Sequence, residues 1–293
     1  MSDRAVLHVK GRVLVGPEEV RDEVWVIDGR ISYDRPTGAA DVRTVEGWAL
    51  PGLVDAHCHV GLDQHGAVPA DVAEKQALTD REAGTLLLRD AGDLTACWPR
   101  QEVEAAIAEA HRLGARVTAH CFAEDSLRDL VEAGIDCIEH ATGLTEDTIP
   151  LFAERGVAIV PTLVNIATFP QIAKAGESKF PRWSAHLTRL HERRYDTVRA
   201  AYDAGVPVYV GTDAGGSLAH GLVAGEVAEL LKAGLPAVDA LSATSWGARA
   251  WLGRPGLEEG ASADLVVYES DPRADVRVLA APRRIVLRGR VVG

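Results

Sequence analysis

Four short apolar segments of the sequence each end on a residue that can bind a metal ion. The first ends at His57, with His59 two residues later, and the others end at His120, His140 and Asp213. A β-strand projects residues two positions apart from the same face, so His57 and His59 can share one ion. Imidazole nitrogens and a carboxylate oxygen suit Zn²⁺, Mn²⁺, iron or Co²⁺. We expect these five residues to hold a divalent metal, with zinc as the first choice.

The segments that carry these residues alternate with stretches of helical pattern between residues 51 and 260. This alternation predicts repeated βα units and a parallel sheet. A single histidine at a strand end is more often a hydrogen-bonded core residue than a metal ligand. Four such strand ends converge on one mouth in a parallel α/β barrel, which favours a shared site. The predicted helices cover 71–83, 101–112 after Pro99, 125–133, about 183–204, and two stretches between 221 and 252.

Both ends of the chain have a different residue pattern, with short segments rich in Val, Ile and Leu. The Asp28-Gly29 pair between two such segments predicts a type I′ hairpin. We expect residues 1–50 and 261–293 to form one small β-sandwich domain, with residues 51–260 inserted as a metal-binding (β/α) barrel domain.

Charge and composition exclude several classes of protein. The chain has 293 residues, enough for one large α/β domain with a small companion, and 43 acidic against 31 basic residues give a formal charge of −12. This charge repels nucleic acid and anionic membranes, so we expect neither as a partner. The absence of a signal-like segment and of a long apolar run predicts a cytoplasmic protein. Cysteines 58, 97, 121 and 137 do not show a secreted disulfide framework.

Five stretches together resemble the amidohydrolase superfamily of metal-dependent hydrolases. In family order they are Pro51 to His59, Thr118-Ala119-His120, Ile138-Glu139-His140, Gly211 to Gly215, and Glu259 to Val266. The resemblance implies a TIM-type barrel with a flanking β-sandwich. It also implies that His57, His59 and Asp213 hold one metal, while His120 and His140 hold a second or contact the substrate. Arg89-Asp90 and Pro161-Thr162-Leu163 resemble the prolidase and acyl-amino-acid hydrolase branch most.

The sequence departs from that family in one respect. Relatives with two metals carry a bridging carboxylated lysine at the end of the fourth barrel strand, and none of the five lysines here ends an apolar strand. Only six barrel strands are recognisable, near residues 53, 85, 115, 136, 158 and 206, where a closed barrel has eight. The fold class is therefore predicted as α/β, a TIM-type barrel that lacks its third and fourth βα units. One metal is favoured over two, and a subunit contact or a rearranged loop is expected to seal the gap, which favours a homo-oligomer.

The chemistry that these residues allow is hydrolysis by metal-activated water. Asp213 is the expected general base and ligand, and His140 is expected to stabilise the oxyanion. His220 and Arg89 are candidates for contact with a small-molecule substrate. Asp55 either orients the His57 ring or makes an ordinary buried hydrogen bond.

Three functions fit this pattern. The first is a hydrolase that cleaves the C–N bond of an amide, such as a dipeptide or an N-acylated amino acid. The second is a mononuclear-metal deaminase or cyclic-amidine hydrolase, for which Glu124 could transfer protons unless it is only an acid at a helix N-terminus. The third is a homologue with impaired catalysis that binds metal and acts as a binding protein.

Overall fold

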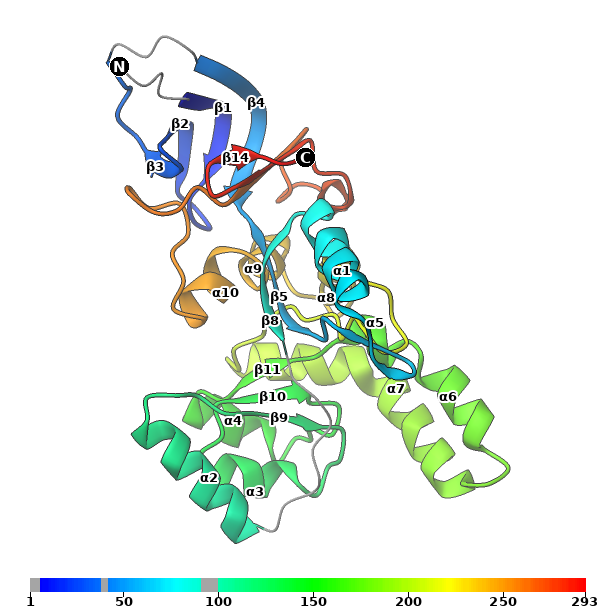
Figure 1. Ribbon diagram of the computed structural model, residues 1–293. Coiled ribbons are helices and arrows are strands. Elements are labelled where there is room, and N and C mark those ends of the chain that lie inside the picture. The colour runs from blue at the N-terminus through cyan, green and yellow to red at the C-terminus, as the bar shows by residue number, and fades with distance from the viewer. Residues whose placement is uncertain (1–5, 38–41, 91–99) are drawn as a thin grey trace.

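The computed structural model describes residues 6–37, 42–90 and 100–293. Figure 1 shows a sheet built from both ends of the chain at one end of the molecule, and the βα elements below it. This sheet has seven strands in the order β14-β13-β12-β4-β1-β2-β3. Its strands are β1 (Val6–Leu14), β2 (Val20–Ile27), β3 (Arg30–Ser32), β4 (Val42–Pro51), β12 (Leu265–Tyr268), β13 (Arg284–Leu287) and β14 (Arg290–Val291).

Two tight hairpins join neighbouring strands of this sheet. Asp28 and Gly29 connect β2 to β3 with φ values of 52° and 81°, and both signs match the predicted type I′ turn. Arg288 and Gly289 connect β13 to β14 in the same way, with φ values of 49° and 78°. Strands from the two ends of the chain therefore share one sheet, although the boundary of a separate domain stays a prediction.

Outside this sheet, the described part of the chain has five strands of three or more residues, and predicted ligands lie on three of the five. The five strands are β5 (Leu53–Cys58), β8 (Thr85–Asp90), β9 (Thr118–Cys121), β10 (Cys137–His140) and β11 (Ala158–Val160). All pairings among them are parallel. The predicted sixth strand, near residue 206, is an extended segment between β11 and β5. Tyr209 N–H donates to Ile159 O at 2.9 Å on one side, and Ala56 N–H donates to Val210 O at 2.8 Å on the other.

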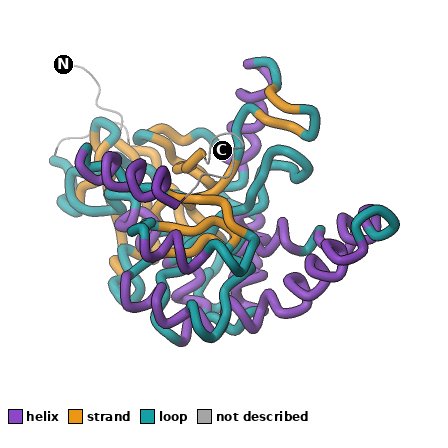
Figure 2. The backbone as a smooth tube through the Cα atoms, turned by 90° about the horizontal axis from the view of Figure 1, so that it is seen from below, coloured by secondary structure: helices purple, strands orange, loops and turns teal. Residues whose placement is uncertain are grey.

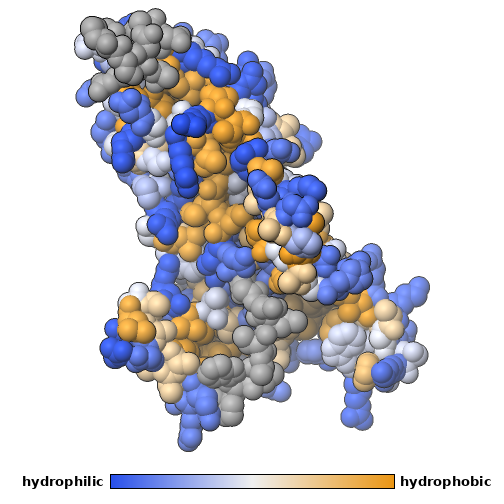
Figure 3. Space-filling view, viewed as in Figure 1, coloured by the Kyte–Doolittle hydropathy of each residue, from blue (hydrophilic) through white to orange (hydrophobic). Residues whose placement is uncertain are grey.

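Within the described residues, these six segments form an open arc and not a closed barrel. The order along the arc is β8, β5, the segment around residue 209, β11, β10 and β9. Every residue of β5 and β10 is buried, whereas most residues of β8 and β9 are half-buried, as expected for strands at the two ends of an arc. Figure 3 shows hydrophobic side chains in a band from the terminal sheet toward β5 and β8.

Helices cover the outside of the arc. They are α1 (Ala70–Glu82), α2 (Arg100–Arg112), α3 (Leu127–Glu132), α4 (Ile149–Arg155), α5 (Leu163–Ile166), α6 (Phe169–Gly176), α7 (Pro181–Asp203), α8 (Val223–Lys232), α9 (Ala237–Ser242) and α10 (Trp246–Trp251). A short hairpin, β6 (Leu62–Asp63) and β7 (Gly66–Ala67), follows β5, and a 3₁₀ helix, η1, spans Val276–Ala280. No helix in the described part of the chain is long and apolar enough to cross a membrane.

Most of the expected helices are present, with corrections. The prediction of two helices between 221 and 252 was wrong, because the stretch holds three. Pro236 occupies the N-cap of α9, where its fixed φ and missing N–H suit the start of a helix. Helices α4, α5 and α6 were not predicted from the sequence. Pro99, expected to open α2, and Cys97 lie outside the described residues.

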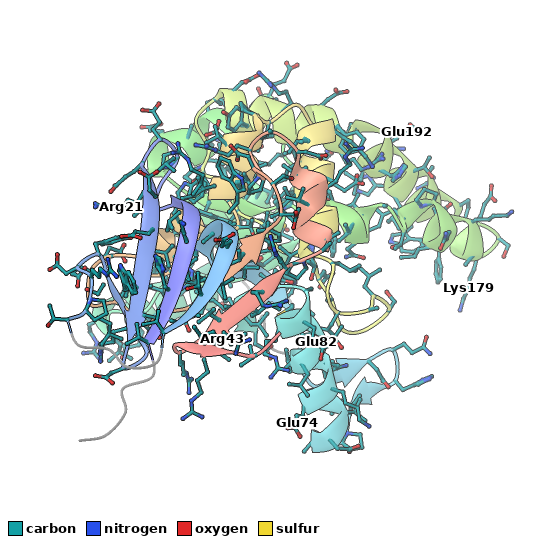
Figure 4. The ribbon with its side chains drawn as sticks, turned by 90° about the horizontal axis from the view of Figure 1, so that it is seen from above. Arg21, Arg43, Glu74, Glu82, Lys179 and Glu192 are labelled. Atoms are coloured by element: carbon teal, nitrogen blue, oxygen red, sulfur yellow. The ribbon has the colours of Figure 1, made fainter. Side chains whose placement is uncertain are left out.

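Helices α6 and α7 form a hairpin that projects from the body of the molecule (Figure 2). An apolar cluster that includes Ile166, Phe169 and Leu190 holds the two helices together. Figure 4 shows Lys179, in the turn between them, at the outer end of this projection. The turn therefore lies far from the arc of strands.

Trp251 of α10 contacts side chains from both ends of the arc. Its ring lies 5.2 Å from the guanidinium carbon of Arg89 on β8 and 5.0 Å from that of Arg116, which precedes β9. It also stacks on Tyr209 with 4.2 Å between centroids and an interplanar angle of 12°. The indole thus links the two edge strands, which have no direct pairing with each other.

Trp251→Ala should lower the free energy of unfolding by about 3 kcal/mol, because it removes a large ring with one stacking and two cation–π contacts. Urea denaturation followed by circular dichroism measures this change. Trp183→Ala is the matched control, since that indole is 44 % exposed and should cost far less. Equal losses in the two variants would contradict a linking role for Trp251.

Candidate metal centre

The first three predicted ligands meet at one carboxylate oxygen. Nε2 of His57 lies 2.9 Å from Oδ1 of Asp213, and Nε2 of His59 lies 3.0 Å from the same atom. Two ligands that each stand about 2.0 to 2.1 Å from one ion are about 3 Å apart at a right angle. The spacing of these donor atoms therefore fits a single divalent cation.

His120 and His140 also lie next to His57, and the ring of His120 stacks on that of His59 with 5.8 Å between centroids. Nδ1 of His120 faces Nε2 of His140 at 3.0 Å. The centroids of these two rings lie 4.8 and 4.9 Å from that of His57. The structure thus brings together all five residues that the sequence predicted, although their roles as ligands stay predictions. Their donor atoms form two groups within 4.8 Å, and His57 belongs to both: His57, His59, Asp213; and His57, His120, His140.

Glu139 fixes the orientation of the His57 ring. Its buried carboxylate contacts Nδ1 of His57 at 2.7 Å, Nη2 of Arg89 at 2.6 Å, and the hydroxyl of Thr118. A carboxylate at Nδ1 favours the tautomer that leaves the Nε2 lone pair free for a metal. Because Nδ1 is engaged, His57 offers one nitrogen and can serve only one ion at a time. Sequence reasoning missed Glu139, although a charged residue inside a buried strand, next to His140, was a usable signal.

Charges in this cluster depend on the same contacts. Burial alone would lower the pKa of His57, but its hydrogen bonds to Asp213 and Glu139 outweigh burial and raise the pKa to about 9. Burial would raise the pKa of Glu139, yet the bond to His57 and the charges of His57 and Arg89 hold it at about 2. The pKa of Asp213 also lies below its usual range, because hydrogen bonds from His57 and His59 outweigh burial. Both carboxylates are therefore ionised at neutral pH.

His140 is neutral at physiological pH. Burial, and then the charge of His57, lowers the pKa of His140 to about 3. Its Nδ1 lies 2.8 Å from the hydroxyl of Thr162. A hydroxyl can donate or accept, so Thr162 supports either tautomer of His140. With one tautomer Nε2 can ligate a metal, and with the other it can donate a proton to an anionic oxygen.

Helix α5 and its N-cap, which follow β11, supply two contacts that sequence reasoning missed. Thr162 holds His140, and Nδ2 of Asn165 donates to Oδ2 of Asp213 at 2.5 Å. Three of the non-glycine residues with positive φ also lie at this centre: His140 at 68°, Thr162 at 47° and Asp213 at 57°. Such backbone is strained for a β-branched residue and tends to occur at functional sites. No local sequence signal predicts it.

The remaining candidates lie around this cluster. The guanidinium of Arg89 contacts Glu139, as described above, and the ring of His220 contacts Asp80 at 2.7 Å. His220 lines a cavity of about 510 Å³ between the β6–β7 hairpin, α1 and the loop after Asp213. Contact of Arg89 or His220 with substrate stays a prediction.

The contacts decide between the two roles predicted for Asp55, whereas the role of Glu124 stays a prediction. Asp55 accepts hydrogen bonds from Thr212 and from the backbone N–H of His57, and the ring of His57 is held by other carboxylates. Asp55 therefore makes an ordinary buried hydrogen bond, and burial raises its pKa to about 6. Glu124 pairs with Arg193 at 2.7 Å and precedes α3.

A buried carboxyl group supports helix α5, which carries Asn165 and follows Thr162. Glu226 of α8 is fully buried and accepts the backbone N–H groups of Leu163 and Val164 at 2.7 and 2.8 Å. Burial outweighs these two hydrogen bonds and raises the pKa of Glu226 to about 8. Between pH 4.5 and 8 the folded chain therefore keeps a proton that the unfolded chain releases.

Stability should consequently fall as pH rises through this window, because the unfolded state binds fewer protons there. Glu226→Gln removes the titrating group and should flatten the decline. Urea unfolding at pH 5, 6.5 and 8 measures the slope, with Glu154→Gln as an exposed control that keeps the wild-type slope. An unchanged slope in Glu226→Gln would show that this carboxyl titrates normally in the folded protein.

Comparison with known sequences agrees with this geometry. Residues 98–292 match the model of the amidohydrolase family. An uncharacterized protein of Mycobacterium tuberculosis is 44 % identical over 362 residues, covering 99 % of this chain and 97 % of the relative. That alignment is longer than the 293 residues of this chain, so the relative contains residues with no counterpart here. Ochratoxinase of Aspergillus niger is 26 % identical over 210 residues, covering 69 % of this chain and 42 % of that protein.

Solved structures show the same fold. A Xaa-Pro dipeptidase with bound methionine in its active site superposes with a TM-score of 0.82 at 19 % identity, covering 99 % of both chains. A. niger ochratoxinase gives 0.78 at 17 % identity, covering 99 % of this chain and 96 % of the other. The family match over more than half of the chain confirms the resemblance predicted from the motifs: this chain belongs to the amidohydrolase family and is a hydrolase acting on C–N bonds.

Proposed function

We propose that this protein hydrolyses the amide bond of a small substrate, such as a dipeptide or an N-acylated amino acid, with the help of one divalent metal ion. One observation carries the proposal. Ring nitrogens of His59, His120 and His140 and the carboxylate of Asp213 all lie close to the ring of His57, although they come from separate segments of the chain. Such a donor set in an amidohydrolase suits zinc, which accepts imidazole and carboxylate ligands together.

The residues that would hold the ion are His57, His59 and Asp213, with His120 as a further imidazole. All five lysines lie in the described part of the chain, on β1, α1, α6, α8 and the turn after α6, and none lies on a strand of the arc. The absence of a lysine at the arc supports one ion over two. When bound, a divalent ion polarises the carbonyl under attack and lowers the pKa of water.

Asp213 would act as the general base. Its carboxylate is ionised, and Asn165 holds one of its oxygens in place. An ionised carboxylate beside the attacking water can take its proton and deliver it to the nitrogen of the leaving amine. His140, neutral and held by Thr162, can donate from Nε2 to the oxygen that becomes negative during the attack.

The two other functions receive less support. Glu124, which a deaminase would need, forms an ion pair with Arg193, so its contacts do not favour proton transfer. Loss of catalysis is not favoured either, because the five site residues remain together despite the short barrel. Release of ammonia instead of an amine would indicate the deaminase. Bound metal without turnover would indicate a binding protein.

The short barrel fits the comparison with longer relatives. We infer that the residues present in the M. tuberculosis relative but absent here include the third and fourth βα units, whose strands would lie between β8 and β9. A sheet edge left unpaired tends to recruit another strand or chain. A second copy of this chain at the gap, and hence a homo-oligomer, is proposed on that basis. The cytoplasmic location expected from the sequence stays a separate proposal.

Elemental analysis of the purified protein, followed by assays of the zinc-reconstituted protein with N-acyl amino acids and dipeptides, tests the proposed function. We expect about one zinc per chain and release of a free amine. A folded, metal-loaded protein that releases no amine from any substrate in the panel would overturn the proposal.

Glu139→Gln should weaken zinc binding by about 10- to 100-fold, because the variant loses the charge that orients His57 and faces Arg89 with an amide. Competition with a chromophoric chelator gives the dissociation constant. Glu154→Gln, an exposed substitution of the same kind on α4, should bind zinc normally. If both variants bind zinc like the wild type, Glu139 does not support the metal centre.

Asp213→Asn should reduce turnover by at least about a hundredfold while much of the metal stays bound, because the amide cannot accept the proton of water. Steady-state rates and metal content are measured on the same preparations. Asp196→Asn, on an exposed position of α7, is the control and should keep its activity. Near-normal rates in Asp213→Asn would remove this residue from the mechanism.

A further inference from the structure

Phe122 is an exposed aromatic side chain in direct contact with the metal centre. It follows β9, two residues after His120, and its ring is stacked on that of His140 with 4.1 Å between centroids and an interplanar angle of 11°. The residue is 37 % exposed, although His140 beneath it is only 3 % exposed. A phenyl group therefore covers His140 and still presents apolar surface outward.

The surroundings of Phe122 hold it in this place. Its carbonyl accepts a hydrogen bond from the hydroxyl of Thr142 at 3.3 Å, and the carbonyl of Thr142 accepts one from Arg193 at 3.1 Å. Arg193 also pairs with Glu124, two residues beyond Phe122. The ring of Phe169 packs against Phe122 with 5.6 Å between centroids. Contacts from β10, α6 and α7 thus converge on the segment that carries Phe122.

Exposure alone does not make a side chain functional. Phe122 differs from the other exposed large apolar side chains in its contact with the metal cluster. In the described part of the chain these are Val42, Leu113, Phe122, Ile172, Phe180 and Trp183. Among them, the ring contacts join only Phe122 to a residue of the metal cluster. Small-molecule sites are mainly lined by hydrophobic and aromatic side chains around a few polar groups. Phe122 has the position and the chemistry of such a lining residue.

We propose that Phe122 determines specificity by packing against an aromatic side chain of the substrate next to the scissile amide. The inference rests on the proposed amide hydrolysis and names its substrate class: N-acyl amino acids with aromatic side chains, preferred over those with small ones. Two aromatic rings in contact gain free energy beyond that of the buried area, which a methyl group cannot supply.

The test compares N-acetyl-L-phenylalanine with N-acetyl-L-alanine as substrates of the zinc-reconstituted wild type, Phe122→Ala and Phe122→Leu. In Phe122→Ala the ratio of kcat/KM for the two substrates should fall by about three- to tenfold, the size of one aromatic contact. Phe122→Leu should lie between, because it restores apolar volume without a ring. Phe180→Ala, which removes another exposed phenylalanine at the N-cap of α7, should leave the ratio unchanged.

A purely structural role gives a different result. If Phe122 only shields His140 from water, Phe122→Ala will lower kcat/KM equally for both substrates, and the inference is overturned. If the wild type hydrolyses neither compound, amide hydrolysis fails for these substrates, but calorimetric titration of both compounds still decides the inference. Preferential binding of the phenylalanine compound that is lost in Phe122→Ala supports it. Equal or undetectable binding of the two compounds contradicts it.

Discussion

The contact on which the rest of the site depends is the pair of carboxylates that hold His57 from opposite sides. Glu139 engages Nδ1 and Asp213 faces Nε2, and both distances are below 3 Å in a buried setting. A buried charge is costly unless it is paired, so each of these groups requires the others. Arg89 on β8 and Thr118 on β9 complete the pairing of Glu139. The same ionic network thus joins the edge strands of the arc and orients the central imidazole.

Next to this network, the strained backbone at Thr162 is stabilised by hydrogen bonds from the following residues to buried Glu226. Thr162 adopts a left-handed conformation that a β-branched residue disfavours, yet it positions a hydroxyl against His140. Glu226 accepts hydrogen bonds from the next two backbone N–H groups, those of Leu163 and Val164, and so fixes the start of α5. The strained residue lies at the N-cap of α5 and its support lies on α8, so the two are far apart in sequence. Packing in three dimensions is needed to maintain this geometry.

The grouping of the five candidate ligands could be predicted from sequence because their signal is local. A buried strand that ends in His57-Cys58-His59, and three more strands that end in His or Asp, require only the periodicity of β-structure. Glu139 left a usable signal, as a charged residue in a buried strand, whereas Thr162 and Asn165 could not be assigned because their roles come from contacts between elements. The stacking of Phe122 on His140 could not be predicted for the same reason. The hairpin at Asp28-Gly29 was predictable from turn chemistry, whereas the short helices α5 and α6 carry too few turns for a clear period.

Strand β4 runs into β5 with only Gly52 between them, so the strand that bears His57 is a continuation of the terminal sheet. The last four residues of β4, Trp48–Pro51, pair with Leu265–Tyr268 of β12. During synthesis, the base of the His57 strand therefore lacks its neighbour until more than 260 residues have been translated. All five residues of the histidine cluster have been translated by Asp213, so the final 30 residues complete the sheet from which β5 extends, and not the cluster itself.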